Sequence, residues 1–499
     1  MKSANNFALP RPKTSGIALP ANDAIPTDLL IGDSWREGSS KQRIPVLNPA
    51  NGEVITTIAD ATLEDGMAAV EAAAKAAPSW AATPARQRAE ILRRCYDKMI
   101  ANADWLAHLI SLEMGKALPD SKGEVLYAAE FFRWYSEETP RIIGELQTSP
   151  GGANRIMVEY QPIGISLLIT PWNFPAAMAT RKIAPALGAG CTVILKPAIE
   201  TPLTAFAVAQ ILLDAGVPPG VVNVITPKDP GPVCAAIMHD PRVRKLSFTG
   251  STNVGRALLR TAADTVLNCS MELGGNAPFL VFDDANVDEA VDGAMIAKMR
   301  NGGQACTATN RFYVQKGVLK EFTEKFTARM KALKLGDGTD PDTQLGPVIT
   351  EKQANKIAGL VDGAVKEGAK VLLGGKRPDN SGYFYPATVL TDVPPTATIL
   401  KDEIFGPVAP IIAFDTEEEG IRLSNDTHYG LAAYLYTKDL KKGLSIAEKL
   451  EYGMVGINRG LVSDTAAPFG GVKQSGLGRE GSHHGLIEFT ECKYIAVTW

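Results

Sequence analysis

The sequence contains little cysteine and no long apolar run. Six cysteines among 499 residues are too few for a disulfide scaffold, and none lies in a CxxC pair or a close Cys/His cluster, so we expect no metal site. No uncharged apolar run reaches the length of about 18 residues that a transmembrane helix needs, so no membrane span is expected. We expect buried free thiols in a reducing compartment, and therefore a cytoplasmic protein.

A basic excess is also missing. The 51 Lys and Arg residues against 55 Asp and Glu residues give a formal net charge of −4, which argues against nucleic acid as a partner. Residues 1–27 lack a continuous apolar stretch and a clear amphipathic pattern, so they predict a flexible N-terminal arm rather than a secretory signal. The composition, 45% apolar and 21% charged, is typical of a folded chain, and this length corresponds to about three domains.

The first third of the chain predicts strands followed by helices. Residues 28 to about 60 read as short strands separated by turns, with Asn-Gly at 51–52. Residues 62–145 read as mostly helical and begin with Thr62 and Asp65, a pattern that resembles a capping box. Residues 154–163 predict an extended, exposed segment that pairs with another strand.

The middle of the chain alternates short apolar strands with helices. The strands are expected at 165–170, 192–196, 221–226 and 245–250, and the helices near 178–188, 202–215, 230–239 and 252–263. This alternation indicates right-handed βαβ units and a parallel sheet. Ligands of such sheets bind beyond the carboxyl ends of the strands. That rule selects the segments after Thr170, Leu195, Thr226 and Phe248.

A second alternation begins at the apolar run 278–282. Helices near 285–300 and 317–334 and strands at 370–375 and 409–414 continue it. The sequence therefore predicts an α/β protein with two nucleotide-fold-like lobes.

Three segments carry candidate catalytic groups. Cys306 follows a Gly-Gly-Gln-Ala turn, where a thiolate would be accessible and its own amide could help to form an oxyanion hole, although most cysteines are simply buried. Glu272 stands before two glycines, where it is a general base or an ordinary ion-pair partner. Asn173, in a Pro-bounded turn, is either an oxyanion donor or a turn residue.

Further motifs are weak when taken singly. Phe248-Thr-Gly-Ser-Thr with Gly255 forms a strand–glycine–helix junction that can receive a phosphate, but it lacks the full GxGxxG spacing. Lys196 follows another strand and places a cation near the same edge. Glu403 and Phe405 precede a tight Gly-Pro turn.

Taken together, these motifs resemble the aldehyde dehydrogenase family in order and spacing, from about residue 28 to residue 499. The spacing of 34 residues between Glu272 and Cys306 is the most specific feature. The resemblance implies that Cys306 attacks an aldehyde to form a thiohemiacetal and that Asn173 and the Cys306 amide stabilise the oxyanion. Hydride transfer to a nicotinamide then leaves a thioester, and Glu272 activates the water that hydrolyses it.

The resemblance also implies a cofactor site. Glu403 would hold the nicotinamide ribose with Phe405 beside it, Trp172 and Lys196 would line the adenosine ribose, and Gly250 and Ser251 the pyrophosphate. The full expected set is Thr170, Pro171, Trp172, Lys196, Ile199, Gly250, Ser251, Gly255, Leu273, Glu403 and Phe405.

The cofactor preference depends on Ile199. Family members that prefer NAD commonly carry Glu three residues after the lysine, where it binds the ribose hydroxyls, whereas NADP users carry a small residue. Here Ile199 takes that position and Glu200 is shifted by one. This favours NADP, or the use of both NADP and NAD. Ala308 also differs from some family members, which carry a second cysteine at this position and form a redox-switch disulfide. With alanine here, that switch is not expected.

The substrate expectation rests on three residues. The segments 450–464 and 467–482 look like those of succinate-semialdehyde dehydrogenases, in which two arginines and a serine hold the far carboxylate; the matching positions are Arg181, Arg300 and Ser463. The expected substrate is succinate semialdehyde, with glutarate semialdehyde or a broad aldehyde set as the alternative. A non-catalytic protein and a cofactor-independent hydrolase of activated esters remain rivals from other classes.

The resemblance implies a domain organisation as well. The cofactor-binding domain would consist of residues 28–142 and 163–273, and the catalytic domain of residues 274–480. A small β oligomerisation element would combine residues 143–162 with 481–499, and the N-terminal arm would be residues 1–27. A strand-rich arm is a poor independent unit, so a homodimer or homotetramer is expected.

Overall fold

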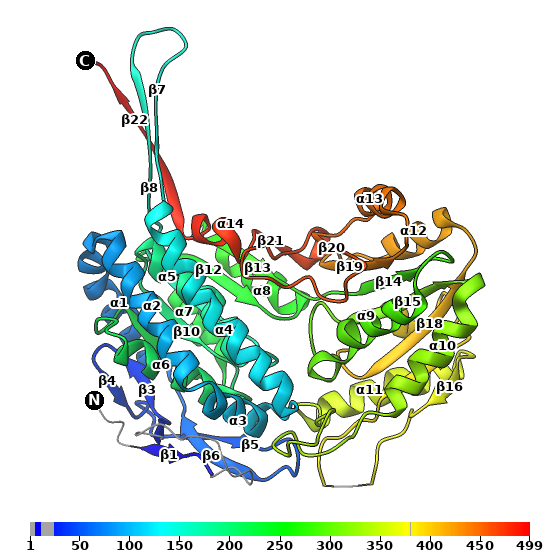
Figure 1. Cartoon of the computed structure of the whole chain (residues 1–499). Coiled ribbons are helices and arrows are strands. Elements are labelled where there is room, and N and C mark those ends of the chain that lie inside the picture. The colour runs from blue at the N-terminus through cyan, green and yellow to red at the C-terminus, as the bar shows by residue number, and fades with distance from the viewer. Residues whose placement is uncertain (1–4, 11–23, 380) are drawn as a thin grey trace.

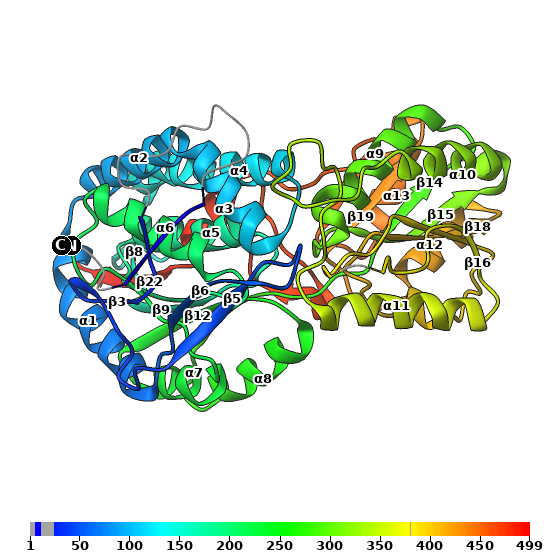
Figure 2. The same ribbon diagram turned by 90° about the horizontal axis from the view of Figure 1, so that it is seen from below.

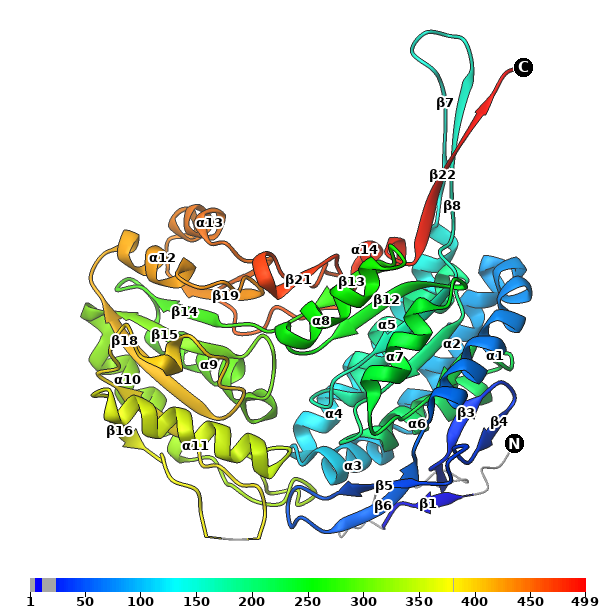
Figure 3. The same ribbon diagram turned by 180° about the vertical axis from the view of Figure 1, so that it is seen from behind.

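The computed structural model describes residues 5–10, 24–379 and 381–499 (Figure 1). Two α/β lobes lie next to each other, and a narrow arm of strands rises from the first lobe. Figure 3 shows the chain's C-terminus on this arm, while the first strands of the chain lie at the opposite end of the same lobe.

The first lobe is built on an eight-stranded sheet in the order β21-β13-β12-β9-β10-β11-β3-β4. Five of its strands run parallel: β9 (Ile165–Ile169), β10 (Val193–Lys196), β11 (Val222–Val224), β12 (Val243–Thr249) and β13 (Asn268–Glu272). Antiparallel strands close both ends: β3 (Leu29–Ile31), β4 (Ser34–Arg36) and β21 (Gly476–Leu477). The parallel alternation predicted for this region is confirmed.

The crossover helices of this lobe agree with the predicted ranges within a few residues. They are α5 (Pro175–Ala189), α6 (Pro202–Asp214), α7 (Pro230–His239) and α8 (Thr252–Ala263). Four earlier helices complete the layers: α1 (Leu63–Ala82), α2 (Ala85–Ala101), α3 (Ala103–Met114) and α4 (Leu118–Glu138). Figure 2 shows α2 and α4 on one side of the lobe and α7 and α8 on the other.

The start of α1 confirms the predicted capping box. The Asp65 amide donates to Thr62 Oγ1 at 3.3 Å, and the Thr62 amide donates to Asp65 Oδ2 at 3.0 Å. Two of the amides that a helix start leaves unpaired are therefore satisfied by side chains. The hairpin β5 (Arg43–Leu47) and β6 (Val54–Ala59) turns around Asn51-Gly52, as the sequence predicts.

The second lobe contains a seven-stranded sheet in the order β16-β17-β18-β15-β14-β19-β20. Its strands are β14 (Ala277–Val281), β15 (Thr309–Gln315), β16 (Lys370–Leu373), β17 (Thr388–Thr391), β18 (Val408–Phe414), β19 (Ala432–Tyr436) and β20 (Met454–Ile457). Its helices are α9 (Val287–Met299), α10 (Lys316–Lys331), α11 (Glu351–Lys366), α12 (Glu417–Asn425) and α13 (Leu440–Lys449).

One strand of this sheet corrects the prediction. The strand at 370–375 was expected to continue the parallel alternation, but β16 runs antiparallel to β17 at the sheet edge. The described residues between the two strands, 374–379 and 381–387, contain no helix, and a parallel pair needs a long crossover connection.

The arm consists of three antiparallel strands in the order β22-β8-β7. These are β7 (Glu145–Thr148), β8 (Arg155–Pro162) and β22 (Thr490–Val497), and α14 (Ser482–Ile487) leads into the last. The pairing predicted for residues 154–163 is therefore present. The side chains of Ile143, Leu146 and Tyr494 are exposed on or beside the arm.

The predicted N-terminal arm lies partly outside the described residues. Within it, β1 (Asn6–Ala8) pairs with β2 (Ala24–Pro26), and Leu9 and Ile25 are buried. These parts are therefore packed against the first lobe rather than loose, because their apolar side chains reach its core.

The cysteines also correct the prediction. Cys95, Cys191 and Cys234 are buried, Cys269 and Cys306 are partly exposed, and Cys492 is exposed. Cys492 escapes burial because it lies on β22, within the exposed arm.

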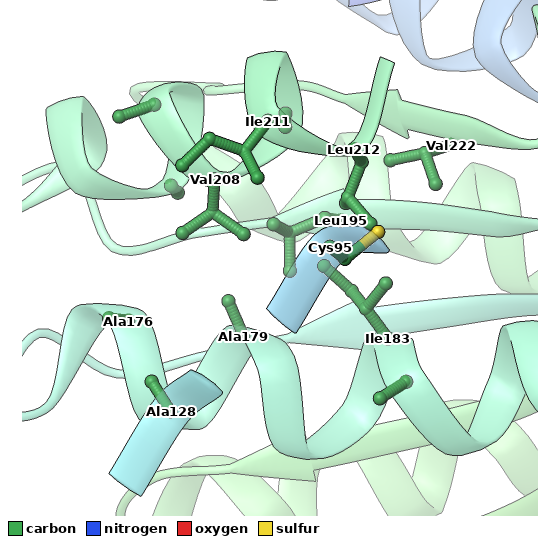
Figure 4. Packing of buried hydrophobic residues seen from close by; sticks show 14 of the residues in the cluster. Cys95, Ala128, Ala176, Ala179, Ile183, Leu195, Val208, Ile211, Leu212 and Val222 are labelled. Carbon is green, nitrogen blue, oxygen red and sulfur yellow. The ribbon is translucent and has the colours of Figure 1, made fainter. Parts of the chain in front are cut away.

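The core of the first lobe fixes α5 between α4, α6 and the sheet. Figure 4 shows Ala176, Ala179 and Ile183 of α5 facing Leu195 and Val208, with Cys95 among them. Alanines at the contact face let neighbouring elements approach closely, and each large apolar side chain buried here stabilises the fold by about 1.5–3 kcal/mol. The rigidity of α5 matters because it carries residues of the cavity described next. In the described part of the chain, no helix combines the length and apolarity that crossing a membrane requires.

Candidate active site

A cavity of about 210 Å³ opens beyond the carboxyl ends of β9, β12 and β13, and residues of the second lobe complete its wall. This is the edge of the sheet that the predicted topology selects. Of the residues predicted for a site, the cavity brings together Pro171, Trp172, Asn173, Arg181, Gly250, Ser251, Leu273, Arg300, Cys306, Glu403, Phe405 and Ser463.

Five predicted residues do not line the cavity: Thr170, Lys196, Ile199, Gly255 and Glu272. Lys196 ends β10 and Ile199 follows it, and β10 lies beyond β9 and therefore further along the sheet edge. Gly255 lies in α8 behind the cavity wall, where a Cβ atom would come within 2.4 Å of Leu273 Cδ2. The absence of a side chain at Gly255 thus lets Leu273 reach the cavity.

Cys306 follows a left-handed stretch of backbone. Asn301, Gly302 and Gly303 have φ values of 55°, 59° and 75°. A Cβ atom at Gly303 would lie 2.3 Å from the Gly406 carbonyl oxygen, so glycine is required there on two grounds. Burial raises the pKa of the Cys306 thiol to about 12, and the nearby Arg181 guanidinium opposes this shift.

Asn173 lies next to the Cys306 segment. Its Nδ2 donates to the Gln304 carbonyl at 3.1 Å, and its Oδ1 is buried without a hydrogen-bond partner in the described structure. Glu124 of α4 accepts from the amides of Ala176 and Ala177 at 2.8 and 3.2 Å, which caps the start of α5 immediately after Asn173. The amide side chain is therefore held at the cavity wall.

Glu272 lies behind the cavity rather than on its wall. Its Oε1 is 2.9 Å from the position that a Cβ atom of Gly470 would take, and its Oε2 is buried with no hydrogen-bond partner among the described residues. Burial raises the pKa of Glu272 well above its ordinary value, the charge of Glu480 raises it further, and Lys182 and Arg181 oppose the shift. Lys182 in turn pairs with Glu480 and donates to Ser247 Oγ at 3.0 Å.

Two arginines line the cavity and make part of its wall cationic. Arg181 is buried with Phe469 at 4.1 Å from its guanidinium carbon, and its Nη2 donates to Tyr127 Oη at 2.9 Å. Arg300 lies 4.8 Å from the Phe174 ring centroid, and none of the described carboxylates comes within 4.0 Å of its nitrogens. Arg300 is thus the cation with more unused donors.

Another part of the cavity wall is built around Glu403 and Phe405. The Gly275 amide donates to Glu403 Oε1 at 3.2 Å, and Phe405 meets Trp172 edge to face with ring centroids 5.3 Å apart. Helix α11 holds this segment, since Gln353 Nε2 donates to the Phe405 carbonyl at 2.9 Å and Lys356 Nζ donates to the Glu403 carbonyl at 2.7 Å.

Ten lining residues were not among the predicted site residues: Tyr127, Phe174, Met178, Thr249, Gly274, Ala305, Thr307, Gln353, Lys356 and Phe469. Gln353 and Lys356 are three residues apart on a helix that the sequence reading did not include, and that spacing places both on one face. No comparable local signal marks Tyr127 or Phe469.

The cavity also has the features that a dinucleotide requires. Ser251 caps α8, whose N-terminus can receive a phosphate, and Thr249 Oγ1 is buried without a partner in the part of the chain described. A Cβ atom at Gly274 would lie 3.1 Å from the Tyr429 ring and 3.2 Å from Glu403 Oε2, so its absence leaves space beside the carboxylate. These residues fit a pyrophosphate and a ribose.

Comparison with known proteins identifies the family. The model of the aldehyde dehydrogenase family matches residues 35–495. The chain belongs to the aldehyde dehydrogenase family. The resemblance found in the sequence and the predicted α/β fold class are both confirmed.

Individual aldehyde dehydrogenases match over most of their length. A succinate-semialdehyde dehydrogenase of Paenarthrobacter nicotinovorans is 55% identical over 89% of this chain and 99% of its own. A glutarate-semialdehyde dehydrogenase of Pseudomonas putida is 49% identical over 94% of this chain and 97% of its own. A crystal structure described as an Escherichia coli NADP-dependent enzyme superposes with a TM-score of 0.94 at 46% identity, covering 95% of this chain and 98% of that one.

Proposed function

We propose that this aldehyde dehydrogenase oxidises succinate semialdehyde to succinate with NADP or NAD as hydride acceptor. The observation that carries the proposal is a single cavity whose wall contains the nucleophile Cys306 and two cations, Arg181 and Arg300, together with Ser463. A substrate with an aldehyde at one end and a carboxylate at the other matches both features. Arginine binds carboxylates with two parallel hydrogen bonds, which fixes orientation as well as charge.

In the first step the Cys306 sulfur attacks the aldehyde carbon. The thiol first releases its proton to solvent water, which reaches the partly exposed Cys306; the thiolate then forms the C–S bond as the C=O π electrons move to oxygen. Arg181 and Arg300 oppose the burial that raises the thiol's pKa. The developing oxyanion is stabilised by Asn173 Nδ2 and the Cys306 amide.

Bound NADP or NAD supplies the acceptor for the hydride that leaves the thiohemiacetal carbon. The residues that would hold it are Ser251 at the start of α8, Glu403 at the ribose and Phe405 beside the ring. The loss of hydride leaves a thioester on Cys306, and this bond keeps the acyl group in place until water attacks.

Glu272 is the residue we assign to water activation. A carboxyl whose pKa is raised by burial accepts a proton more readily than an exposed carboxylate does. Its side chain must turn toward Cys306 to act, because it lies behind the cavity wall.

The cofactor preference is a further part of the proposal. Ile199 cannot accept a hydrogen bond from a ribose hydroxyl, and it does not repel a 2′-phosphate as a carboxylate would. Lys196 is then available for the phosphate. The Escherichia coli neighbour described as NADP-dependent supports this preference.

The alternative substrate is glutarate semialdehyde, which one similar relative is named for. It differs by one methylene, and a hydrophobic pocket discriminates one methylene by only about 1–3 kcal/mol. We therefore expect some activity with both acids.

We also propose the division into a cofactor-binding domain (28–142 and 163–273), a catalytic domain (274–480) and an oligomerisation element (143–162 and 481–499). The two sheets and the arm support this division. One strand crosses it, because β21 lies within the 274–480 range but pairs with β13 of the first lobe. The exposed side chains of Ile143, Leu146 and Tyr494 support association through the arm into a dimer or tetramer.

The test is steady-state formation of reduced cofactor with each of NADP and NAD against succinate semialdehyde, glutarate semialdehyde and butanal. We expect succinate semialdehyde to give the highest kcat/KM. The Cys306→Ala variant should bind cofactor but show no turnover. Equal kcat/KM for butanal and for the two acids would refute the proposed substrate, and full turnover by Cys306→Ala would refute the mechanism.

A further inference from the structure

Asn301 stands between two parts of the proposed machinery. It follows Arg300 directly and precedes Cys306 by five residues, in the left-handed stretch that joins them. Its side chain is 1% exposed. Sequence reasoning gave it no role.

The Asn301 side chain joins the two segments that carry Asn173 and Cys306. Its Nδ2 donates to the Asn173 carbonyl at 2.8 Å and to the Gln304 carbonyl at 3.0 Å. Asn173 Nδ2 donates to the same Gln304 carbonyl at 3.1 Å. The two asparagines and the residue two before the nucleophile therefore form one closed set of hydrogen bonds.

The backbone of Asn301 is anchored from a third direction. Its amide donates to Asp120 Oδ2 of α4 at 2.7 Å, and its carbonyl accepts from the Gln304 amide at 3.1 Å. Gln304 Oε1 accepts from the Ile349 amide at 3.1 Å, which ties the turn to the second lobe. Both lobes thus hold the turn on which Asn301 lies.

The residue type suits this position for two reasons. Asparagine tolerates φ of 55° better than most residues, and its amide supplies two donors on one nitrogen. Both donors meet carbonyl oxygens, so an aspartate of the same shape would face two acceptors. A glycine would keep the backbone and lose both bonds.

We propose that Asn301 is a positioning residue that sets the separation between the oxyanion donor Asn173 and the nucleophile Cys306. The role rests on the proposed function and adds a residue to it. Formation of the C–S bond places negative charge on the former carbonyl oxygen, and that charge is stabilised only when the Asn173 amide lies within hydrogen-bond reach. A shift of about 1 Å in such a constellation costs roughly 100-fold in rate.

The experiment compares Asn301→Asp and Asn301→Gly with the wild type in the burst of reduced cofactor that reports thioester formation. We expect the burst rate with succinate semialdehyde to fall about 10- to 100-fold in both variants, while KM for the aldehyde and the dissociation constant of NADP change less than about twofold. A cofactor-independent measurement, hydrolysis of p-nitrophenyl acetate, should fall by a similar factor because its tetrahedral intermediate needs the same oxyanion donor.

Asn223→Asp provides the matched control. Asn223 is buried in β11 and also donates through Nδ2 to two backbone carbonyls, those of Val193 and Gly220. We expect it to lower the melting temperature while leaving the burst rate unchanged. Burst rates within twofold of wild type in both Asn301 variants would overturn the proposal, as would an equal loss in Asn223→Asp at matched stability. Absence of reduced cofactor in the wild type would instead refute the proposed function.

Discussion

Arg181 Nη1 lies 3.5 Å from Glu480 Oε2, so this cavity-lining arginine already shares its charge with a buried carboxylate. The other carboxylate oxygen of Glu480 pairs with Lys182. Arg181 and Arg300, which we propose to bind the substrate carboxylate and together call the clamp, therefore differ in how far other groups already use their charge. Arg181 belongs to an internal network, whereas no carboxylate of the described residues lies within 4.0 Å of the Arg300 nitrogens.

Replacing Arg300 with Ala tests the clamp. We expect kcat/KM for succinate semialdehyde to fall about 10- to 100-fold, since a hydrogen bond to a charged group contributes roughly 1.5–3 kcal/mol. The value for butanal should change little, and the ratio of the two substrates is the measurement. A parallel loss for both aldehydes would contradict the clamp.

Arg181→Ala, by comparison, should also lower the melting temperature, because it removes one of the two cations beside the Glu480 carboxylate. Breaking a buried ion pair costs about 3–5 kcal/mol when nothing replaces the lost charge. Lys182 remains, so the loss should lie toward the lower end.

Replacing Glu272 with Gln separates the two halves of the reaction. We expect a burst of about one reduced cofactor per active site, followed by turnover at least 100-fold slower than wild type, because water activation by a general base contributes about 10²–10⁴-fold. The burst is followed at 340 nm and the trapped thioester by mass spectrometry. A variant that turns over at the wild-type rate would remove Glu272 from this step.

Glu403 should make stability depend on pH. Burial raises its pKa to about 7, so the folded protein binds more protons than the unfolded chain between about pH 4.5 and pH 7. Its contribution to stability is therefore lost as the pH rises through that window, by up to roughly 2 kcal/mol for this partly exposed side chain. Glu403→Gln should reduce that loss, measured as urea midpoints at pH 5 and pH 8. Identical pH profiles would contradict the assignment.

Ile199→Glu tests the cofactor preference. A carboxylate at this position can accept from the ribose hydroxyls of NAD and repels a 2′-phosphate, so we expect kcat/KM for NADP to fall at least 10-fold relative to that for NAD, a change of about 1.4 kcal/mol or more. Ile199→Ala serves as the control without charge. A variant that keeps the wild-type ratio would show that residue 199 does not face the cofactor.

Local patterns predicted the elements that depend on local chemistry. Apolar runs bounded by glycine and proline located the parallel strands of the first lobe, and the Thr62 cap located the start of α1. The rule that ligands bind beyond the carboxyl ends of parallel strands placed Asn173 and Gly250 at one edge of one sheet. These signals are contained within a few residues.

What the sequence did not predict depends on distant partners. Helix α11 carries Gln353 and Lys356 to a segment about fifty residues later in the chain, and nothing near either residue indicates that contact. The burial of Glu272 behind the cavity wall depends on Gly470, which arrives from the far end of the chain. The exposure of Cys492 depends on the arm's projection from the lobe.

Helix α5 fixes the distance between two residues that we propose to act on the substrate, Asn173 and Arg181. Asn173 lies two residues before Pro175, where the helix begins, and Arg181 lies nearly two turns along it. At about 1.5 Å per residue, about 9 Å of backbone therefore separates the start of the helix from Arg181. Glu124 caps the start of this helix, and the alanine-lined contacts shown in Figure 4 hold the helix against its neighbours. A relative that prefers longer semialdehydes therefore has to differ in the side chains at the two ends of this segment, because the rise of the helix backbone fixes the distance between them.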